Sequence, residues 1–235
     1  MQFDPPLIPA TLLRRYNRFL ADVTLADGTP LTVHCANPGT MLSVSTPGAR
    51  VWLQDSCNPR RKLRFSWKLI ALEDGHLAGI DTGVPNRIVG DALAARAIPS
   101  LQDYATVRAE VRYGEKSRVD FLLEGGAAPI YVEVKNVHLR RRDALAEFPD
   151  CVTARGARHL EELAAMVRAG HRAVLLYVIQ RTDCTSMRLA ADLDPAYAVA
   201  ARQARDAGVE MLAHRAEIST QSVVLGGVMP LDAET

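Results

Sequence analysis

The feature that most constrains the fold is an uninterrupted apolar run over residues 173–179. Seven residues are far fewer than the ~20 that a helix needs to cross a bilayer, so the run is interpreted as a strand buried on both faces. A segment with apolar residues at helical spacing, 153–169, precedes it and ends at Gly170. A helix, a short turn and a buried strand form a crossover unit. The sequence therefore predicts a sheet that helices cover.

The rest of the second half alternates between helix and strand in the same way. Helical patterns occupy residues 87–97 and 194–207, and Gly208 ends the second of them. Further strands are predicted at residues 106–113, 118–124, 130–139 and, last in the chain, 210–218. The second half is therefore predicted to be an α/β domain with a mixed sheet.

The first half has the period-two alternation of antiparallel strands. Turn residues at 26–29, 37–40 and 46–49 separate the alternating segments. Residues 12–82 thus indicate about five short strands, the number expected of a small β-barrel of the oligonucleotide-binding (OB) type. The predicted fold class is α/β, as an α+β two-domain chain. An OB-fold-like barrel occupies residues 1–84, and a mixed sheet flanked by helices occupies residues 85–235.

Charge and cysteine usage exclude several classes of protein. The chain has 28 Lys and Arg against 27 Asp and Glu, a formal net charge of +1, so any surface that binds anions must be local. The four cysteines are far apart and form no Cys-x-x-Cys pair, which argues against a disulfide framework and a zinc ribbon. The N-terminus lacks a basic region followed by an apolar segment. A cytoplasmic location without membrane association is therefore expected.

The pattern that carries chemistry lies on two neighbouring strands. Glu133 and Lys135 are two residues apart and share one strand face, while Val132 and Val134 share the apolar face. If residues 118–124 pair with this strand as a hairpin, Asp120 lies opposite the Glu133 end. Two carboxylates then converge beside one lysine.

This convergence predicts a metal site. Converging carboxylates repel each other unless a cation lies between them. A hard divalent ion, Mg²⁺ or Mn²⁺, takes one or two carboxylates and binds phosphate oxygens in its remaining positions, so Asp120 and Glu133 are the predicted ligands. Lys135 would orient a water or stabilise the charged phosphorane, as a phosphodiester hydrolase requires. Glu110, on the preceding strand, is predicted to be a third acidic group of the catalytic site.

A solvated sheet surface is the alternative for these charges, since most charged residues are exposed. The neighbouring residues argue against it. Glu133 stands between valines, and Asp120 stands between Val119 and Phe121. Charges inside apolar strands are costly unless they are paired or functional, which favours the metal site.

Two basic clusters are candidates for nucleic-acid contacts. The first lies in a loop just before Phe65 and Trp67 and consists of Arg60, Arg61, Lys62 and Arg64. Such loops pair with phosphates while bases stack on nearby rings. The second directly follows the strand of Lys135 and consists of Arg140, Arg141 and Arg142. The alternative for each cluster is a solvated loop, with the two aromatic rings in the core.

A third group lies on the helical segment 153–169. Arg155, His159 and Glu162 follow one another at spacings of four and three and so share one stripe of the helix. The stripe either faces the predicted site or forms surface salt bridges. The sequence leaves both open.

The chain also resembles known families. The order helix, strand, strand with Asp120, strand with Glu133 and Lys135, helix, strand is similar to the core of the PD-(D/E)xK nuclease superfamily, the restriction-endonuclease-like fold. Over both halves the chain resembles the sugar fermentation stimulation protein A (SfsA) family. That resemblance rests on residues 3–7, 15–23, 34–39, 117–121, 131–135 and 148–156. It implies an OB barrel joined to a nuclease-like domain, DNA binding and a link to the regulation of sugar (maltose) utilisation.

By position, the resemblance places the Asp, Glu and Lys of the PD-(D/E)xK motif at Asp120, Glu133 and Lys135. The Pro that precedes the Asp in this motif is replaced by Val119. A DNA-binding protein with a metal-dependent nuclease site is therefore expected. Two alternatives stay open: a DNA-binding regulator of sugar metabolism that does not cleave, and an enzyme acting on a small phosphorylated sugar. The carboxylates favour catalysis, because a pure binder gains nothing from groups that repel phosphate.

Overall fold

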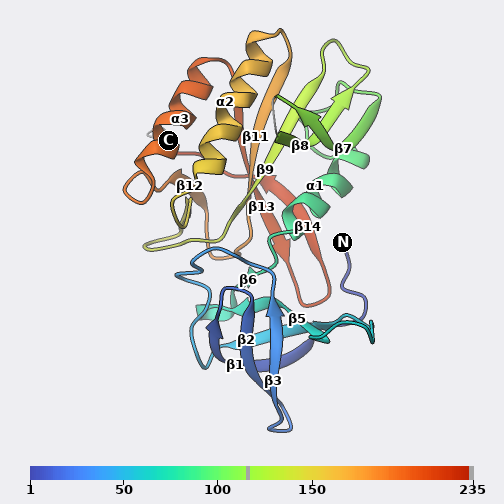
Figure 1. Cartoon of the computed structure of the whole chain (residues 1–235), viewed down its shortest axis with the longest axis vertical. Helices are drawn as coiled ribbons and strands as arrows, with labels where there is room; N and C mark the ends of the chain where they lie inside the picture. The colour runs from blue at the N-terminus through green and yellow to red at the C-terminus, as the bar shows by residue number, and fades with distance from the viewer. Residues whose placement is uncertain (115–116, 233–235) are drawn as a thin grey trace.

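The computed structural model describes residues 1–114 and 117–232, and its two parts are stacked end to end. In Figure 1 a β-barrel formed by the first third of the chain, blue to teal, lies below a larger body of sheet and helices. The N-terminus lies beside that upper body, not at the far end of the barrel.

The barrel sheet has the strand order β3-β2-β1-β4-β5-β6. Its strands are β1 Ile8–Tyr16, β2 Leu20–Leu25, β3 Pro30–Cys35, β4 Arg50–Asp55, β5 Phe65–Ala71 and β6 Leu77–Gly79. A parallel pairing of β3 with β5 closes the first five strands into a barrel, and β6 continues the sheet beyond β5. The predicted five-stranded OB-type barrel is confirmed.

The side chains that point inward at every second position of the strands form the core of the barrel. Val23, Val33, Val51 and Trp67 point inward and are fully buried. Strand β1 was not assigned from the sequence, because its register shifts between Leu12 and Arg14 and the bulge interrupts the alternation.

The upper body is built on a mixed sheet with the strand order β14-β13-β11-β9-β8-β7. These strands are β7 Thr106–Tyr113, β8 Ser117–Glu124, β9 Ile130–Val137, β11 Arg172–Ile179, β13 Glu210–Ile218 and β14 Val223–Val228. The central strands β9, β11 and β13 are parallel, and the outer pairings are antiparallel. The predicted mixed sheet is confirmed.

Helices cover both faces of this sheet. Helices α2 Ala154–Arg168 and α3 Pro195–Asp206 share one hydrophobic core with it, and α1 Val84–Ala94 packs in the core on the other face. Thr153 caps α2, because its Oγ1 accepts a hydrogen bond from the Gly156 amide at 3.1 Å. No helix in the described parts of the chain is long and apolar enough to cross a membrane.

Some elements differ from the sequence-based expectation. Helix α1 begins three residues earlier than predicted, since Pro85 is tolerated in a first helical turn. A short parallel pair, β10 Leu145–Phe148 and β12 Ser186–Leu189, was not predicted. Neither was β14, which follows β13 and shows that β13 is not the last strand.

Backbone hydrogen bonds join the two parts. The Gly79 amide of β6 donates to the Gln180 carbonyl at 2.9 Å, and the Thr182 amide donates to the Leu77 carbonyl at 3.0 Å. At the N-terminus, Phe3 lies in the core of the upper body, although the predicted barrel domain began at residue 1. The predicted division between residues 84 and 85 stays a prediction; β6 ends at Gly79 and α1 begins at Val84.

Candidate active site

Asp120 lies where strands β8 and β9 separate. The two strands pair from Leu123 and Ile130 up to Phe121 and Val132, so the next position of the register sets Asp120 opposite Glu133. The ladder ends there, and the Asp120 carboxylate takes its place. Its Oδ2 accepts a hydrogen bond from the Val134 amide at 2.7 Å, and its Oδ1 accepts one from Asn86 Nδ2 at 2.6 Å. The carboxylate is thus held between the sheet and α1.

Glu133 and Lys135 point from β9 toward α2. Lys135 Nζ donates to Glu133 Oε1 at 2.7 Å, and His159 Nδ1 of α2 contacts the same oxygen. Glu133 and His159 are both buried. The structure therefore brings Asp120, Glu133 and Lys135 together, as predicted, and the stripe on α2 faces this site through His159.

The hydrogen bonds define the tautomer of His159. Arg155 Nε donates to His159 Nε2 at 3.3 Å, so Nε2 is the acceptor and Nδ1 carries the proton. His159 Nδ1 therefore donates to Glu133. Because the histidine and the lysine both bind Oε1, they fix the orientation of the Glu133 carboxylate.

The two carboxylates have opposite pKa shifts. Burial and the neighbouring charge of Glu133 raise the pKa of Asp120 to about 6. Burial acts on Glu133 in the same direction, but the hydrogen bond from His159 and the charge and hydrogen bond of Lys135 outweigh it and lower its pKa. Glu133 is therefore ionised and Asp120 stays partly protonated near neutral pH as long as no cation lies between them.

A divalent cation fits this donor set. Glu133 Oε2 is buried and has no hydrogen-bond partner, which is costly for a carboxylate oxygen. The charge of Glu133 also opposes ionisation of Asp120, and a cation would relieve that repulsion. In the described segments no three His, Cys, Asp or Glu side chains form a metal-holding group, so water and phosphate oxygens would complete the coordination.

Three more buried polar atoms without a hydrogen-bond partner lie on β7, β8 and α2: Tyr113 OH, Ser117 Oγ and Glu162 Oε2. Burial and the charges of Glu133, Glu162 and Asp120 raise the pKa of Tyr113 far above its usual value. The carboxylates of Glu133, Glu162 and Asp120 thus give Tyr113 an anionic environment. Of the residues of the site, Asn86 was missed from the sequence, where nothing distinguished it from other polar helix residues.

Glu110 makes no hydrogen bond or ion pair with this site within the described residues. Its register position in β7 is opposite Asp120, but its φ is 54° and the ladder skips the pair. The side chain is exposed, and Glu110 is absent from the charges that shift the pKa of Asp120 and Tyr113. The predicted catalytic role of Glu110 therefore has no support in the structure.

This finding predicts that Glu110→Ala leaves the site intact. Affinity for Mg²⁺ by calorimetry and any cleavage rate should stay within a factor of about 2 of the parent values, since the exposed Glu110 carboxylate makes no hydrogen bond or ion pair with the described residues of the site. A loss of cation affinity comparable to that of a change at Asp120 would return Glu110 to the site.

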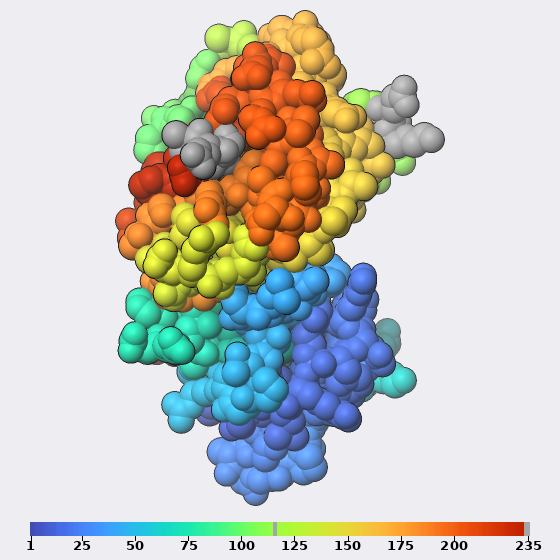
Figure 2. Space-filling model, turned by 90° about the vertical axis from the view of Figure 1, so that its left-hand side faces the viewer, coloured from blue at the N-terminus to red at the C-terminus, as the bar shows by residue number. Residues whose placement is uncertain are grey.

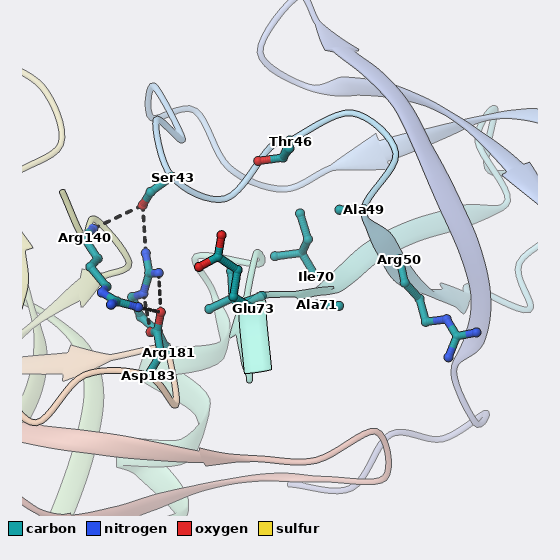
Figure 3. A pocket seen from close by; sticks show the side chains of 11 residues that line it. Ser43, Thr46, Ala49, Arg50, Ile70, Ala71, Glu73, Arg140, Arg181 and Asp183 are labelled. Carbon is teal, nitrogen blue, oxygen red and sulfur yellow. Dashed lines mark hydrogen bonds and ion pairs between the residues drawn. The ribbon is translucent and has the colours of Figure 1, made fainter. Parts of the chain in front are cut away.

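Arg140 and Arg141 are engaged by carboxylates of the same chain. Arg140 Nη1 lies 2.5 Å from Asp183 Oδ2. Figure 3 shows Arg140 and Arg181 next to Asp183 and Ser43. These residues line a cavity of about 410 Å³. Arg141 binds both Glu147 and Asp192. Both arginines therefore make ion pairs within the chain, and a phosphate contact of the exposed Arg142 stays a prediction.

The loop before β5 is the other basic cluster. Arg60, Arg61 and Lys62 are exposed. Arg64 is exposed as well, but it binds Asp55 at 2.6 Å and covers the ring of Phe65, with 5.1 Å between its Cζ and the ring centroid. Trp67 is fully buried, so for this ring the core alternative is correct and no base can stack on it.

Fold and site define a class: two-domain proteins in which an OB barrel is joined to a restriction-endonuclease-like domain. A family model described as the sugar fermentation stimulation protein RE domain matches residues 83–222, and one described as the SfsA N-terminal OB domain matches residues 13–80. The chain belongs to the sugar fermentation stimulation protein family, and the resemblance found in the sequence is confirmed.

Relatives match over nearly the whole chain. The sugar fermentation stimulation protein homologs of Dinoroseobacter shibae and Agrobacterium fabrum are 59% and 49% identical. Each alignment covers 99% of this chain, and 96% and 97% of the respective relative. A solved structure, described as Pyrococcus furiosus SfsA in complex with Ca²⁺, is 28% identical and has a TM-score of 0.87 over 99% of both chains.

Proposed function

We propose that this protein is a Mg²⁺- or Mn²⁺-dependent phosphodiesterase that binds and cleaves DNA. The observation that carries the proposal is the convergence of Asp120, Glu133 and Lys135 where β8 and β9 separate. An unpartnered carboxylate oxygen of Glu133 and a raised pKa of Asp120 are what a cation-binding pair shows without its ion. The Ca²⁺ of the Pyrococcus furiosus structure supports divalent-ion binding, because Ca²⁺ and Mg²⁺ both prefer carboxylate oxygens.

Each residue has a distinct task in this proposal. Asp120 and Glu133 would hold the ion, which when bound polarises a phosphate oxygen and activates water. Asn86 and the Val134 amide orient Asp120, and His159 orients Glu133. Lys135 places its ammonium beside the carboxylates, where it stabilises the negative charge that develops on the phosphate.

The barrel would supply non-specific affinity for the nucleic acid. OB barrels bind oligonucleotides on a strand face and adjoining loops. In this chain the exposed residues Arg60, Arg61 and Lys62 lie in such a loop. Their contacts would be with phosphates, since Trp67 is buried and Arg64 covers Phe65. A cytoplasmic location goes with this function and stays a prediction.

The double change Arg60→Ala and Arg61→Ala should weaken binding equally for every sequence tested. Each lost phosphate contact reduces the slope of log affinity against log salt by about 1, so we expect a decrease of about 2. Fluorescence anisotropy from 50 to 300 mM salt, on the order of the range that resolves such slopes, measures it. The matched control removes two arginines from α2 and α3, Arg168 and Arg202. An unchanged slope in the first variant would exclude the loop from the interface.

The proposal itself is tested by incubating the purified chain with labelled nucleic acids, with and without divalent cations. Cation-dependent cleavage supports it. Binding without cleavage would favour the alternative, a DNA-binding regulator of sugar metabolism that does not cleave.

A further inference from the structure

A crevice of about 330 Å³ lies between the barrel and the upper body, apart from the carboxylate site. The barrel loop at residues 37–39 and Thr82 form one side of it, and the other side comes from the end of β9 and the segment 148–153. Figure 2 shows this light-blue loop region of the barrel against the yellow segment of the upper body at the waist of the molecule. The crevice thus needs both domains.

Close contacts hold its two sides together. Thr40 Oγ1 donates to the Asp150 carbonyl at 2.8 Å, and the Met41 amide donates to Asp150 Oδ2 at 3.2 Å. A Cβ on Gly39 would lie 2.5 Å from Asp150 Oδ2, so only glycine allows this approach. Arg15 fixes the same loop by donating to the carbonyls of Asn37 and Gly39, both at 2.8 Å. The crevice is therefore preformed.

Its walls are largely apolar, with one unused donor. The apolar surface comes from Pro38, Phe148, Pro149 and Val152, and the Val152 side chain is 73% exposed. Buried His138 also lines the crevice. Asn136 Nδ2 and His138 Nδ1 are 3.0 Å apart; because Asn136 Oδ1 accepts from Gln180, Nδ2 donates, and His138 Nε2 carries the ring proton.

His138 Nε2 makes no hydrogen bond of good geometry, and its neighbour is the Asp150 carboxylate. It lies 3.3 Å from Asp150 Oδ2, but the geometry is not that of a hydrogen bond, and the atom is buried. A buried N–H that makes no well-aligned hydrogen bond is costly, and a ligand with an aligned acceptor recovers the bond. The crevice therefore offers a donor between apolar walls.

Charge excludes a phosphate from the crevice. His138 and the Met41 amide outweigh burial and lower the pKa of Asp150, so an ionised carboxylate stands in the wall. Cations lie outside it instead. Arg18 is exposed and close enough to Cys151 to affect its thiol, and Arg155 is exposed two residues beyond Thr153. A ligand with a neutral ring inside the crevice and phosphate groups outside it, near the two arginines, matches these charges.

We propose that this crevice binds one unstacked nucleobase of a single-stranded segment next to the cleavage site. The inference rests on the proposed function. Continuity with the carboxylate site supports it, because Thr153 lines the crevice and caps α2. His159 of the same helix contacts Glu133, and Arg155 donates to His159. The ring packs on the apolar walls, and a ring nitrogen or carbonyl oxygen accepts from His138 Nε2.

The test compares two labelled single strands of equal length and charge, one with bases and one in which abasic residues replace them. Anisotropy is measured with chelator so that nothing is cleaved. The parent should bind the base-containing strand at least ~10-fold more tightly, since contact with one base is worth about that much. Val152→Asp should remove most of this preference, because it sets a second carboxylate at the mouth.

Leu42→Asp is the matched control, since Leu42 is 63% exposed and lies outside the crevice lining. It adds the same charge and should keep the preference for bases. If the parent binds the two strands equally, or if both variants lose the preference for bases to the same extent, the crevice is not a base-binding site, although the protein still binds nucleic acid. No binding of either strand overturns the proposed function itself, and the crevice with it.

Discussion

Replacing Lys135 with alanine should lower the rate of cleavage by at least ~10²-fold while cation affinity and DNA affinity stay near the parent values. The reason lies in the geometry: Lys135 Nζ is 2.7 Å from Glu133 and places its charge where negative charge develops on the phosphate. An interaction made mainly in the transition state lowers turnover and leaves binding largely intact. Single-turnover cleavage of a labelled strand and calorimetry with Mg²⁺ measure both.

Lys62→Ala is the control, because it removes an exposed lysine of the barrel loop. It should change affinity for nucleic acid slightly and the cleavage step not at all. If Lys135→Ala only weakens binding and no preparation cleaves, Lys135 is one phosphate contact among several and the protein is a binder.

Asp120→Asn should abolish detectable Mg²⁺ or Mn²⁺ binding in calorimetry. The amide keeps the shape of the side chain but removes one of the two negative charges that a hard cation requires. Glu110→Gln, an exposed change on the neighbouring strand, should bind the ion as the parent does. Equal affinity in Asp120→Asn and the parent would mean that the ion binds elsewhere or that the chain has no such site.

The same variant should change the pH dependence of stability in chelator. The folded pKa of Asp120, about 6, exceeds its ordinary value of 3.8, so the folded state holds this proton more tightly. Stability is therefore lost as pH rises from about 4 through about 6, by roughly 3 kcal/mol in total from this group. Asp120→Asn does not titrate, so it lacks this pH-dependent loss of stability. Its amide nitrogen, itself a donor, faces a second donor, Asn86 or the Val134 amide, and this destabilises the variant equally at every pH.

The free energy of unfolding, measured with denaturant at pH 4 and pH 7, separates these two effects. The difference between variant and parent should shift by roughly 2 kcal/mol in favour of the variant on going from pH 4 to pH 7. A difference that is constant over this range would show that Asp120 is ionised throughout and is not strained by Glu133.

Most of the regular elements could be predicted, because each one buries its own apolar face. The buried run of β11, the helix α2 ending before Gly170 and the hairpin of β8 and β9 all follow from local periodicity. The pair β10 and β12 could not, since each strand has four residues and the two are about 40 residues apart. Strand β1 was missed because its bulge breaks the alternation.

The candidate site divides in the same way. The period of two on β9 predicted that Glu133 and Lys135 share a face, and the hairpin register predicted Asp120. A positive φ at Glu110 interrupts the ladder opposite Asp120, and no sequence pattern indicates such a backbone conformation. Arg140 and Arg141 were expected to be available for phosphates, but their carboxylate partners Asp183 and Asp192 come about 40 to 50 residues later and only the fold brings them together.

The most direct test of the central claim is a cleavage assay on the full chain. Labelled single- and double-stranded DNA and RNA are incubated with the parent, Asp120→Asn and Lys135→Ala, each with Mg²⁺, Mn²⁺ or chelator. We expect the parent to cleave at least one DNA substrate with a divalent ion, to stop in chelator, and to lose this activity in both variants. Absence of cleavage with either ion on all four substrates, or equal cleavage by parent and variants, would contradict a phosphodiesterase site at Asp120, Glu133 and Lys135.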